Sequence, residues 1–163
     1  MNYSIRRLAP SDQQFLWDML YQSLHVPAGG QLFPRDVINE PELAKYVRDW
    51  GRAGDLGYVA VDESSGKAVG AAWLRLLTAD ESGYGYVNDE TPEIGMAVLS
   101  EYRGRGIGSE LLRRLVQSAG AVHRAVSLSV SRANQAVRLY ERAGFERVWE
   151  SDTSITMLKR LES

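Results

Sequence analysis

A glycine-rich stretch, YRGRGIGSELL at residues 102–112, has the residue types and spacing of an anion-binding turn. Its three glycines, at positions 104, 106 and 108, directly precede an apolar segment of helical spacing. The first N–H groups of a helix have no partner within the helix, and the helix dipole places about half a positive charge there. Because glycine has no side chain to keep a bulky phosphate away, the stretch predicts a phosphate site at a helix N-terminus.

Two familiar phosphate-binding loops do not fit this stretch. The nucleotide P-loop ends in Gly-Lys-Ser or Gly-Lys-Thr, and no such tripeptide follows. The dinucleotide fingerprint requires a glycine at position 109, where the chain has Ser109, and an acidic residue about 20 positions further on. Residues 111–140 contain no Asp or Glu. A nucleotide- or dinucleotide-dependent function is therefore excluded.

Thiol and zinc chemistry are also excluded as functions. The chain has no cysteine, which rules out disulfides, thiolate nucleophiles and cysteine zinc sites. The two histidines, His25 and His123, have no partner at metal-ligand spacing. We expect no metal.

Hydrophobic periodicity and turn residues predict the elements that position this loop. The expected order is strand, two helices, three strands, helix, strand, helix and two strands, which is a mixed α/β sheet. The expected strands cover residues 2–9, two runs within 56–77 joined at 64–67, 92–98, 125–130, 145–151 and 154–161. The first expected helix begins with a capping box at Ser11 and Gln14 and continues to Ser23. The other expected helices cover residues 41–50, 107–119 and 134–144.

Two segments together resemble the GCN5-related N-acetyltransferase (GNAT) family. The first is Arg103-x-x-Gly106-x-Gly108, between a strand and an apolar helix. The second is SLSVSRANQAVRLYERAGFERV, residues 127–148, with a strand, an asparagine, a short helix containing a tyrosine, and Gly-Phe. The motifs occur in the family's order and cover about residues 92–149. The resemblance implies a mostly antiparallel sheet of about seven strands, with helices on both faces and a splayed parallel strand pair at the cofactor site.

The family's cofactor is acetyl-CoA, and the resemblance implies which residues would bind it. Its pyrophosphate would lie on the amides of the loop and helix start, with two arginines adding positive charge. The backbone of the preceding strand would bind the pantetheine arm, and an asparagine would hydrogen-bond the same arm. The implied cofactor-binding residues are Met96, Ala97, Val98, Arg103, Gly104, Arg105, Gly106, Ile107, Gly108, Ser109 and Asn134. Asn134 could equally be a helix N-cap.

Acetyl transfer to an amine needs a base, a polarised thioester carbonyl and an acid for the leaving thiolate. Glu93 is the candidate base, with Asp89 and Glu90 as alternatives in the preceding loop. The N–H group of Met96 or Ala97 is expected to polarise the carbonyl. Tyr140 matches the family tyrosine that protonates the thiolate. Alternatively, neither residue has a catalytic role: Glu93 is a solvated glutamate at the end of a strand, and Tyr140 packs its ring on the sheet.

The acceptor is expected to be a primary amine of a small molecule or a peptide. Tyr84, Tyr86, Asp89 and Glu90 are substrate candidates, since the family's acceptor enters near that loop and the first two helices. Acidic residues there favour a cationic amine. A non-catalytic acyl-CoA-binding module is the alternative function.

Size and charge set further limits. At 163 residues we expect one domain over residues 1–163, with 44% hydrophobic residues as in ordinary globular proteins. The net charge of -2 provides no general attraction to nucleic acid or anionic membranes. The N-terminus lacks a signal-peptide core and the apolar run at 68–74 is too short to span a bilayer, so we expect a cytoplasmic protein without a nucleic-acid or membrane partner. A homodimer is common in the family.

Overall fold

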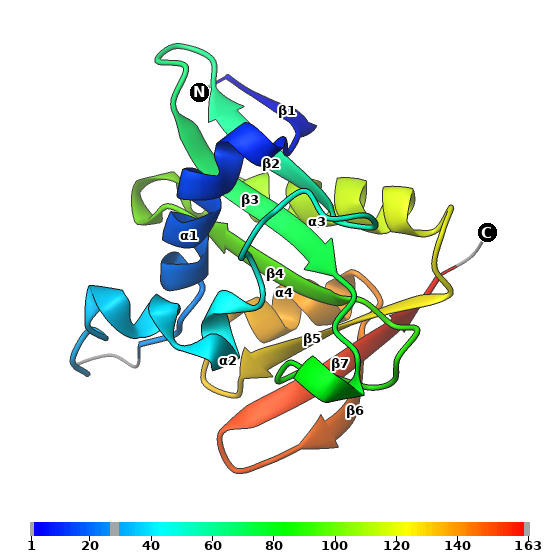
Figure 1. Cartoon of the computed structure of the whole chain (residues 1–163). Coiled ribbons are helices and arrows are strands. Elements are labelled where there is room, and N and C mark those ends of the chain that lie inside the picture. The colour runs from blue at the N-terminus through cyan, green and yellow to red at the C-terminus, as the bar shows by residue number, and fades with distance from the viewer. Residues whose placement is uncertain (1, 27–29, 162–163) are drawn as a thin grey trace.

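A mixed sheet of seven strands dominates the computed structural model, which describes residues 2–26 and 30–161. The strands, visible in Figure 1, are β1 (Tyr3–Arg7), β2 (Leu56–Asp62), β3 (Ala68–Arg75), β4 (Glu93–Val98), β5 (Ala125–Ser131), β6 (Glu146–Glu150) and β7 (Ser154–Arg160). Their order across the sheet is β1-β2-β3-β4-β5-β7-β6. Neighbouring strands are antiparallel except β4 and β5, which are parallel. The predicted mixed, mostly antiparallel sheet is confirmed.

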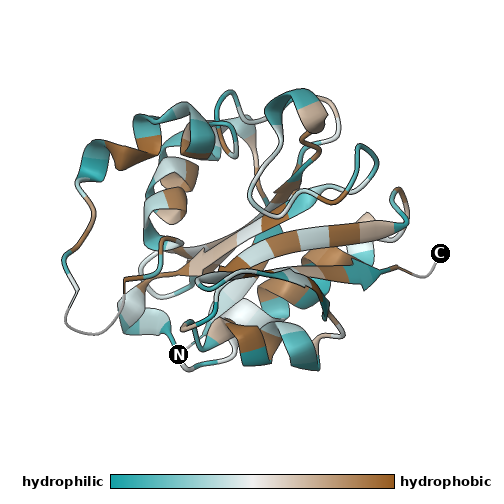
Figure 2. Cartoon of the chain, turned by 90° about the horizontal axis from the view of Figure 1, so that it is seen from below, coloured by the Kyte–Doolittle hydropathy of each residue, from teal (hydrophilic) through white to brown (hydrophobic). Residues whose placement is uncertain are grey.

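Helices cover both faces of this sheet. The α-helices are α1 (Gln13–Gln22), α2 (Pro41–Ala44), α3 (Ile107–Ala119) and α4 (Ala136–Arg142). Short 3-10 turns occupy Pro10–Asp12, Arg35–Asn39, Ala79–Glu81 and Ser100–Tyr102. In Figure 1, α1 and α2 lie in front of the sheet and α3 and α4 lie behind it, and Figure 2 shows the two helical layers from below. In the described ranges no helix combines the length and the hydropathy needed to cross a membrane.

The strand β3 is buried on both faces, as its continuous apolar sequence predicts. Ala72 and Leu74 belong to the core beneath α3 and α4. Ala71 and Trp73 belong to a second core beneath α1 and the segment after α2. The sheet therefore separates two hydrophobic cores.

The helix α3 is held to the sheet by one apolar stripe. Ile107, Leu111, Leu115 and Ala119 are four residues apart and all buried, which confirms the predicted face. Burying each of the larger side chains stabilises the fold by roughly 2 kcal/mol. This stripe fixes the N-terminus of α3 beside the end of β4.

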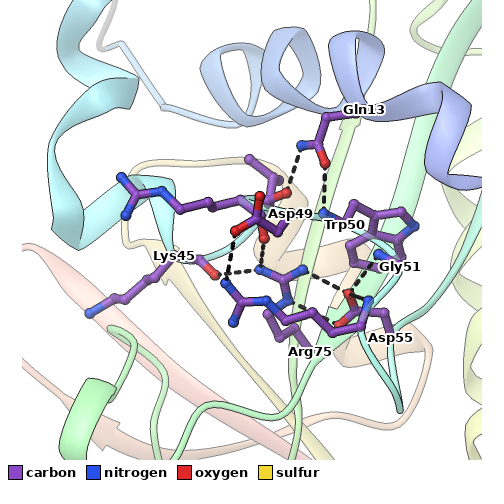
Figure 3. A network of polar contacts seen from close by, with 10 residues as sticks. Gln13, Lys45, Asp49, Trp50, Gly51, Asp55 and Arg75 are labelled. Carbon is purple, nitrogen blue, oxygen red and sulfur yellow. Dashed lines mark hydrogen bonds and ion pairs between the residues drawn. The ribbon is translucent and has the colours of Figure 1, made fainter.

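The predicted helix over residues 41–50 is wrong, because α2 ends at Ala44. Asp49 has a φ of +54°, which a right-handed helix cannot accommodate, and side chains from distant parts of the sequence bind the backbone of the turns that form instead. Gln13 Nε2 donates to the carbonyl of Val47 over 2.7 Å, and Gln13 Oε1 accepts from the N–H of Trp50 over 2.6 Å. The segment after Ala44 therefore forms turns that are tied to α1 (Figure 3).

Arg75, on β3, binds the same segment from the other side. Its Nη1 donates to the carbonyls of Lys45 and Arg48 over 3.0 and 2.7 Å. Its Nε and Nη2 form a bidentate pair with Asp55 at 3.0 and 2.7 Å, and both side chains are 3% exposed (Figure 3). Trp50 packs its ring 5.5 Å from the guanidinium carbon. The turn segment between α2 and β2 is thereby fixed over the sheet.

The capping box predicted from Ser11 and Gln14 does not form. The chain instead turns through Pro10–Asp12, and Asp12 accepts a hydrogen bond from the N–H of Ala9 over 2.8 Å. The same carboxylate forms a bidentate pair with Arg6. Asp12 rather than Ser11 therefore organises the start of α1.

Candidate active site

The parallel strands β4 and β5 separate after one point of pairing. Among the described residues they are paired at Glu93 and Ser127, and the N–H of Ser127 donates to the carbonyl of Pro92 over 3.0 Å. Figure 1 shows the two strands diverging towards their arrowheads. Beyond Glu93 the side of β4 that faces β5 therefore has backbone groups outside the sheet ladder.

The register of β3 and β4 determines which backbone groups face this opening. The N–H of Leu99 donates to the carbonyl of Val69 over 2.8 Å, and the two strands pair antiparallel without a register shift. Because hydrogen-bonded residues alternate along an antiparallel pair, the N–H and C=O groups of Ala97 point towards β3. Those of Met96 and Val98 point towards β5. Of the two proposed carbonyl-polarising donors, the register favours Met96.

The glycine loop lies where β4 leads into α3. Gly104 and Gly106 have φ values of +76° and +81°, and Gly106 is the N-cap residue of α3. A left-handed conformation at this point strongly favours glycine. A Cβ at either position would contact no described residue within 4 Å, so the loop surface is open in this part of the structure. The helix ladder begins with the N–H of Glu110 donating to the carbonyl of Gly106.

The three residues after Gly106 present their N–H groups at the start of α3. Ile107 is 1% exposed and anchors this helix end in the core, while Ser109 is exposed. A Cβ at Gly108 would lie 3.6 Å from Met96 Cε. This short distance shows that the N-terminus of α3 lies close to the opening beside β4. The arrangement suits an anionic group with an extended arm.

Two arginines supply positive charge at the loop. Arg103 is exposed, and its Nε donates to the carbonyl of Val98 over 3.0 Å. Arg105 is also exposed and lies with its guanidinium carbon 5.5 Å from the centre of the Tyr102 ring. Both charges are therefore beside the turn that carries Gly104 and Gly106.

Glu93 is a buried carboxyl group at the closed end of the opening. It is 5% exposed, and its Oε2 accepts a hydrogen bond from the Tyr46 hydroxyl over 2.5 Å. Burial raises the pKa of Glu93 to about 7, while the hydrogen bond from Tyr46, the backbone of Gly85 and the charge of Lys45 oppose the increase. A carboxyl group that titrates near neutrality can act as a general base.

The loop before β4 covers this carboxyl group. A Cβ at Gly83 would overlap both the Glu93 carboxylate and the Tyr46 hydroxyl, so only glycine fits at this contact. The Tyr46 hydroxyl also accepts a hydrogen bond from the N–H of Tyr84 over 2.8 Å. Tyr46 thus connects the covering loop to Glu93.

The family model of the Acetyltransferase (GNAT) family matches residues 17–145, which is most of the chain. This chain belongs to the GNAT acetyltransferase family. The match includes the β4–β5 opening, the glycine loop and the helix that carries Tyr140.

Solved structures share the GNAT fold over nearly the whole chain. A GNAT-family acetyltransferase from Streptococcus pneumoniae has a TM-score of 0.67 and 22% identity, covering 98% of this chain and 99% of that one. The putative acetyltransferase yncA from Salmonella typhimurium, solved with its cofactor acetyl-CoA, has a TM-score of 0.70 and 20% identity, covering 99% and 95%. A phosphinothricin acetyltransferase from Sinorhizobium meliloti, in complex with acetyl-CoA, has a TM-score of 0.67 and 18% identity, covering 99% and 90%. Comparison with curated proteins gave no match.

Tyr140 lies on α4 within the core shared with α3. Its side chain is 7% exposed and meets Phe145 edge-on, with ring centres 5.9 Å apart. Burial raises the pKa of Tyr140 to about 12, so the phenol remains protonated at neutral pH. Tyr140 therefore packs on the sheet, and it also holds the proton that a GNAT acid would need.

Asn134 organises the turn that leads into α4. Its Oδ1 accepts a hydrogen bond from the N–H of Ala136 over 2.9 Å. The helix itself covers Ala136–Arg142, so Asn134 lies just before it. The N-cap residue of α4 is Gln135, so Asn134 is not the helix N-cap; its side-chain oxygen instead closes the turn just before the helix.

The four proposed acceptor residues differ in their surroundings. Tyr84 is 60% exposed, while Tyr86 donates its hydroxyl proton to Asp89 over 2.6 Å. Asp89 also accepts from the N–H of Ala79, and these hydrogen bonds lower the pKa of Asp89. Glu90 is exposed. Asp89 and Glu90 are thus on the outside of the loop, whereas Glu93 is beneath it.

Tyr46 could not be identified as a site residue from the sequence. The helical pattern over residues 41–50 placed it on an ordinary helix, with no motif to distinguish it from its neighbours. The early end of α2 and the turns after it bring its hydroxyl to Glu93. Such a contact, 47 residues apart in sequence, depends on the tertiary structure alone.

Across residues 2–26 and 30–161, no three or more His, Cys, Asp or Glu side chains are grouped closely enough to hold a metal ion. His123 is partly buried, and burial lowers its pKa.

Proposed function

We propose that this chain is an acetyl-CoA-dependent N-acetyltransferase that acetylates a primary amine of a small molecule or peptide by direct attack on the thioester. The observation that carries the proposal is the position of Glu93. A buried carboxyl group whose pKa is about 7 lies where β4 and β5 begin to separate. A carboxylate with this pKa is suited to removing a proton from an amine near neutral pH.

The open glycine loop supports acetyl-CoA as the acyl donor. The residues from Arg103 to Ser109 offer helix-terminal N–H groups and two cationic side chains to an anionic pyrophosphate. The backbone groups of Met96 and the N–H of Val98 point towards β5, where a pantetheine arm would need partners, while the Val98 carbonyl is bound by Arg103. Acetyl-CoA would supply an acyl group activated as a thioester. The Salmonella and Sinorhizobium structures with acetyl-CoA support this assignment by similarity of fold.

Glu93 would accept the proton that the amine loses. Most alkylamines are almost fully protonated at pH 7 and cannot attack until they become neutral. With a pKa of about 7, Glu93 is ionised in a large fraction of molecules at that pH. Its Oε1 is buried and makes no hydrogen bond of good geometry to a described residue, so this oxygen would receive the proton.

The remaining groups would complete a balanced transfer. The amine nitrogen forms the new N–C bond as the C–S bond breaks, and the Met96 N–H stabilises the negative charge that develops on the carbonyl oxygen. Tyr140 gives its proton to the leaving sulfur, and the phenolate then regains a proton from solvent while Glu93 releases the proton that it took from the amine. A phenol whose pKa is about 12 is protonated before every turnover.

The acceptor side is open to a cationic amine. Tyr84 exposes an aromatic ring on the loop, and Asp89 and Glu90 add negative charge beside it. These features would favour binding of a substrate whose amine arrives as an ammonium ion. That ammonium ion must lose a proton before it can react. Glu93 lies beneath the same loop and could take that proton.

A coenzyme A release assay over a panel of primary amines tests this proposal. The panel contains amino acids, polyamines, aminoglycosides and short peptides with free amines, each incubated with acetyl-CoA. Turnover that depends on one class of amine, with the acetylated amine identified by mass spectrometry, is the expected result. Acetyl-CoA binding without turnover on any amine would instead favour a non-catalytic binding module.

A further inference from the structure

The Tyr46 hydroxyl occupies a central position beside the buried carboxyl group of Glu93. It donates to Glu93 Oε2 over 2.5 Å and accepts from the N–H of Tyr84 over 2.8 Å. Both hydrogen-bonding capacities of the phenol are therefore used in one defined orientation. Tyr46 is 6% exposed, so water cannot readily replace either contact.

The two oxygens of Glu93 are consequently different. Oε2 is held by the short hydrogen bond from Tyr46, whereas Oε1 makes no hydrogen bond of good geometry to a described residue. The backbone of Gly85, on the covering loop, also interacts with the carboxylate and favours its ionised form. Ser127, which pairs with Glu93 across the parallel strands, also has a buried hydroxyl without a described partner. Buried polar atoms without partners are rare and usually mark a place for water or a ligand. The free oxygen and the free hydroxyl are on adjacent strands at the closed end of the opening.

The backbone that carries Tyr46 is rigidly held. Arg75 donates to the carbonyls of Lys45 and Arg48 on either side of Tyr46. Asp55 holds the guanidinium of Arg75 in a bidentate pair (Figure 3). A hydroxyl on a segment fixed in this way can hold a partner with little loss of side-chain freedom.

We propose that Tyr46 is a positioning residue of the active site, which fixes Glu93 through Oε2 and leaves Oε1 as the oxygen that receives the proton from the amine. This inference rests on the proposed function, in which Glu93 is the base. It adds a residue that no motif of the sequence distinguishes. Tyr46 touches the base and not the reacting atoms, so its effect on the reaction passes through Glu93.

The charged and titratable groups around Glu93 set the direction of the expected effect. Lys45, on the segment of Tyr46, lowers the pKa of Glu93 through its charge, and Arg75 on β3 is paired with Asp55. Tyr84, on the covering loop, interacts with Tyr46. The hydrogen bond from Tyr46 favours the ionised form of Glu93, so its removal raises the pKa of Glu93 above about 7.

The test is a titration of Glu93 by carboxyl carbon NMR in the Tyr46→Phe protein. The Glu93 signal is assigned by its absence from Glu93→Gln, and the measurement needs neither acetyl-CoA nor an acceptor. We expect a midpoint of about 7 in the parent protein and a midpoint about one pH unit higher in Tyr46→Phe. An unchanged midpoint in folded Tyr46→Phe would overturn the inference.

Tyr58→Phe is the matched control. It also removes a hydroxyl that makes a hydrogen bond inside the protein, between Tyr58 and Ser118 on α3. Tyr58 belongs to the core on the opposite face of the sheet from Tyr46. We expect the Glu93 midpoint to be unchanged in Tyr58→Phe. An equal shift in both variants would show a general loosening of the fold and would contradict a specific role for Tyr46.

Kinetics separate failure of this inference from failure of the proposed function. With an active amine, Tyr46→Phe should reduce kcat about tenfold at pH 6 and leave the KM for acetyl-CoA unchanged. The reduction should vanish when Tyr46→Phe is combined with Glu93→Gln, because Tyr46 acts through Glu93. A reduction that persists in the Glu93→Gln background would refute the positioning role alone. Full activity of Glu93→Gln would refute the base assignment itself.

Discussion

Arg75 and Glu93 are direct neighbours on the antiparallel strands β3 and β4, yet they form no ion pair. The guanidinium of Arg75 is committed to Asp55 and to two backbone carbonyls. An arginine facing Glu93 would hold the carboxylate ionised and its pKa low. Because Asp55 holds Arg75, burial dominates at Glu93 and its pKa rises to about 7. The pairing of Arg75 thus leaves its neighbour free to take up a proton.

This relationship predicts the effect of Asp55→Asn. The change leaves Arg75 as a buried cation without its partner, which should destabilise the protein by about 3 kcal/mol. The same unpaired charge should lower the pKa of Glu93, as measured by carboxyl NMR. Asp49→Asn is the control. The 3.9 Å ion pair between Asp49 and Arg52 is exposed, so its loss should change the free energy of unfolding by less than about 0.5 kcal/mol. An equally small effect of both changes in urea unfolding would contradict the role given to Asp55.

The cofactor loop is tested by Gly106→Asp. Acetyl-CoA should raise the melting temperature of the parent protein, whereas NAD and ATP should not. Aspartate at position 106 places a side chain and a negative charge against the phosphates, so the acetyl-CoA shift should disappear. Gly66→Asp is the control, because Gly66 also has a positive φ, of +73°, and open space around it in the turn between β2 and β3. A normal shift in folded Gly106→Asp would remove the loop from the cofactor site.

The buried carboxyl group predicts a pH-dependent stability. The folded pKa of Glu93, about 7, is above its ordinary value of 4.5. Its stabilising contribution is therefore complete below about pH 4.5 and is lost as pH rises through 7, by up to about 3 kcal/mol. Glu93→Gln should lack this loss and should become the more stable protein above pH 7. Urea unfolding at pH 5 and pH 9 measures the difference, with exposed Glu90→Gln as a control that follows the parent.

The proposed acid role predicts that Tyr140→Phe lowers kcat and leaves acetyl-CoA affinity nearly unchanged. The hydroxyl acts only while the thioester breaks, so the loss should be in the maximal rate, by about 10² to 10⁴-fold. The ring contact with Phe145 is retained in this variant. If turnover remains complete while chemistry limits the rate, Tyr140 has only its packing role.

Much of the fold could be predicted because local patterns and tertiary packing agree. The four-residue spacing of Ile107, Leu111, Leu115 and Ala119 predicted the buried face of α3, and the apolar run of β3 predicted helices on both faces. The helix predicted over residues 41–50 ends at Ala44, and Gln13 and Arg75 bind the backbone of the turns that replace the rest of it. Neither residue is near that segment in sequence, so no local pattern could show these contacts.

The candidate site likewise combines features that the local sequence predicts with features that depend on long-range contacts. The glycine loop and Glu93 could be located from residue types and spacing, since a phosphate turn and a strand-end carboxyl group are visible in the sequence. The burial of Glu93, its contact with Tyr46 and the cover provided by Gly83 could not. These depend on a loop and a turn segment whose positions are fixed by long-range hydrogen bonds.

The most direct test of the central claim is the pH dependence of kcat/KM in the parent protein and Glu93→Gln, measured by coenzyme A release with an active amine. The parent should lose activity below about pH 7, where Glu93 becomes protonated. Glu93→Gln should lose about 10²-fold or more near neutrality and recover part of it as pH approaches the pKa of the amine, where free amine is abundant. A uniform loss at every pH would assign Glu93 to substrate binding, and no loss at any pH would contradict its role as the base.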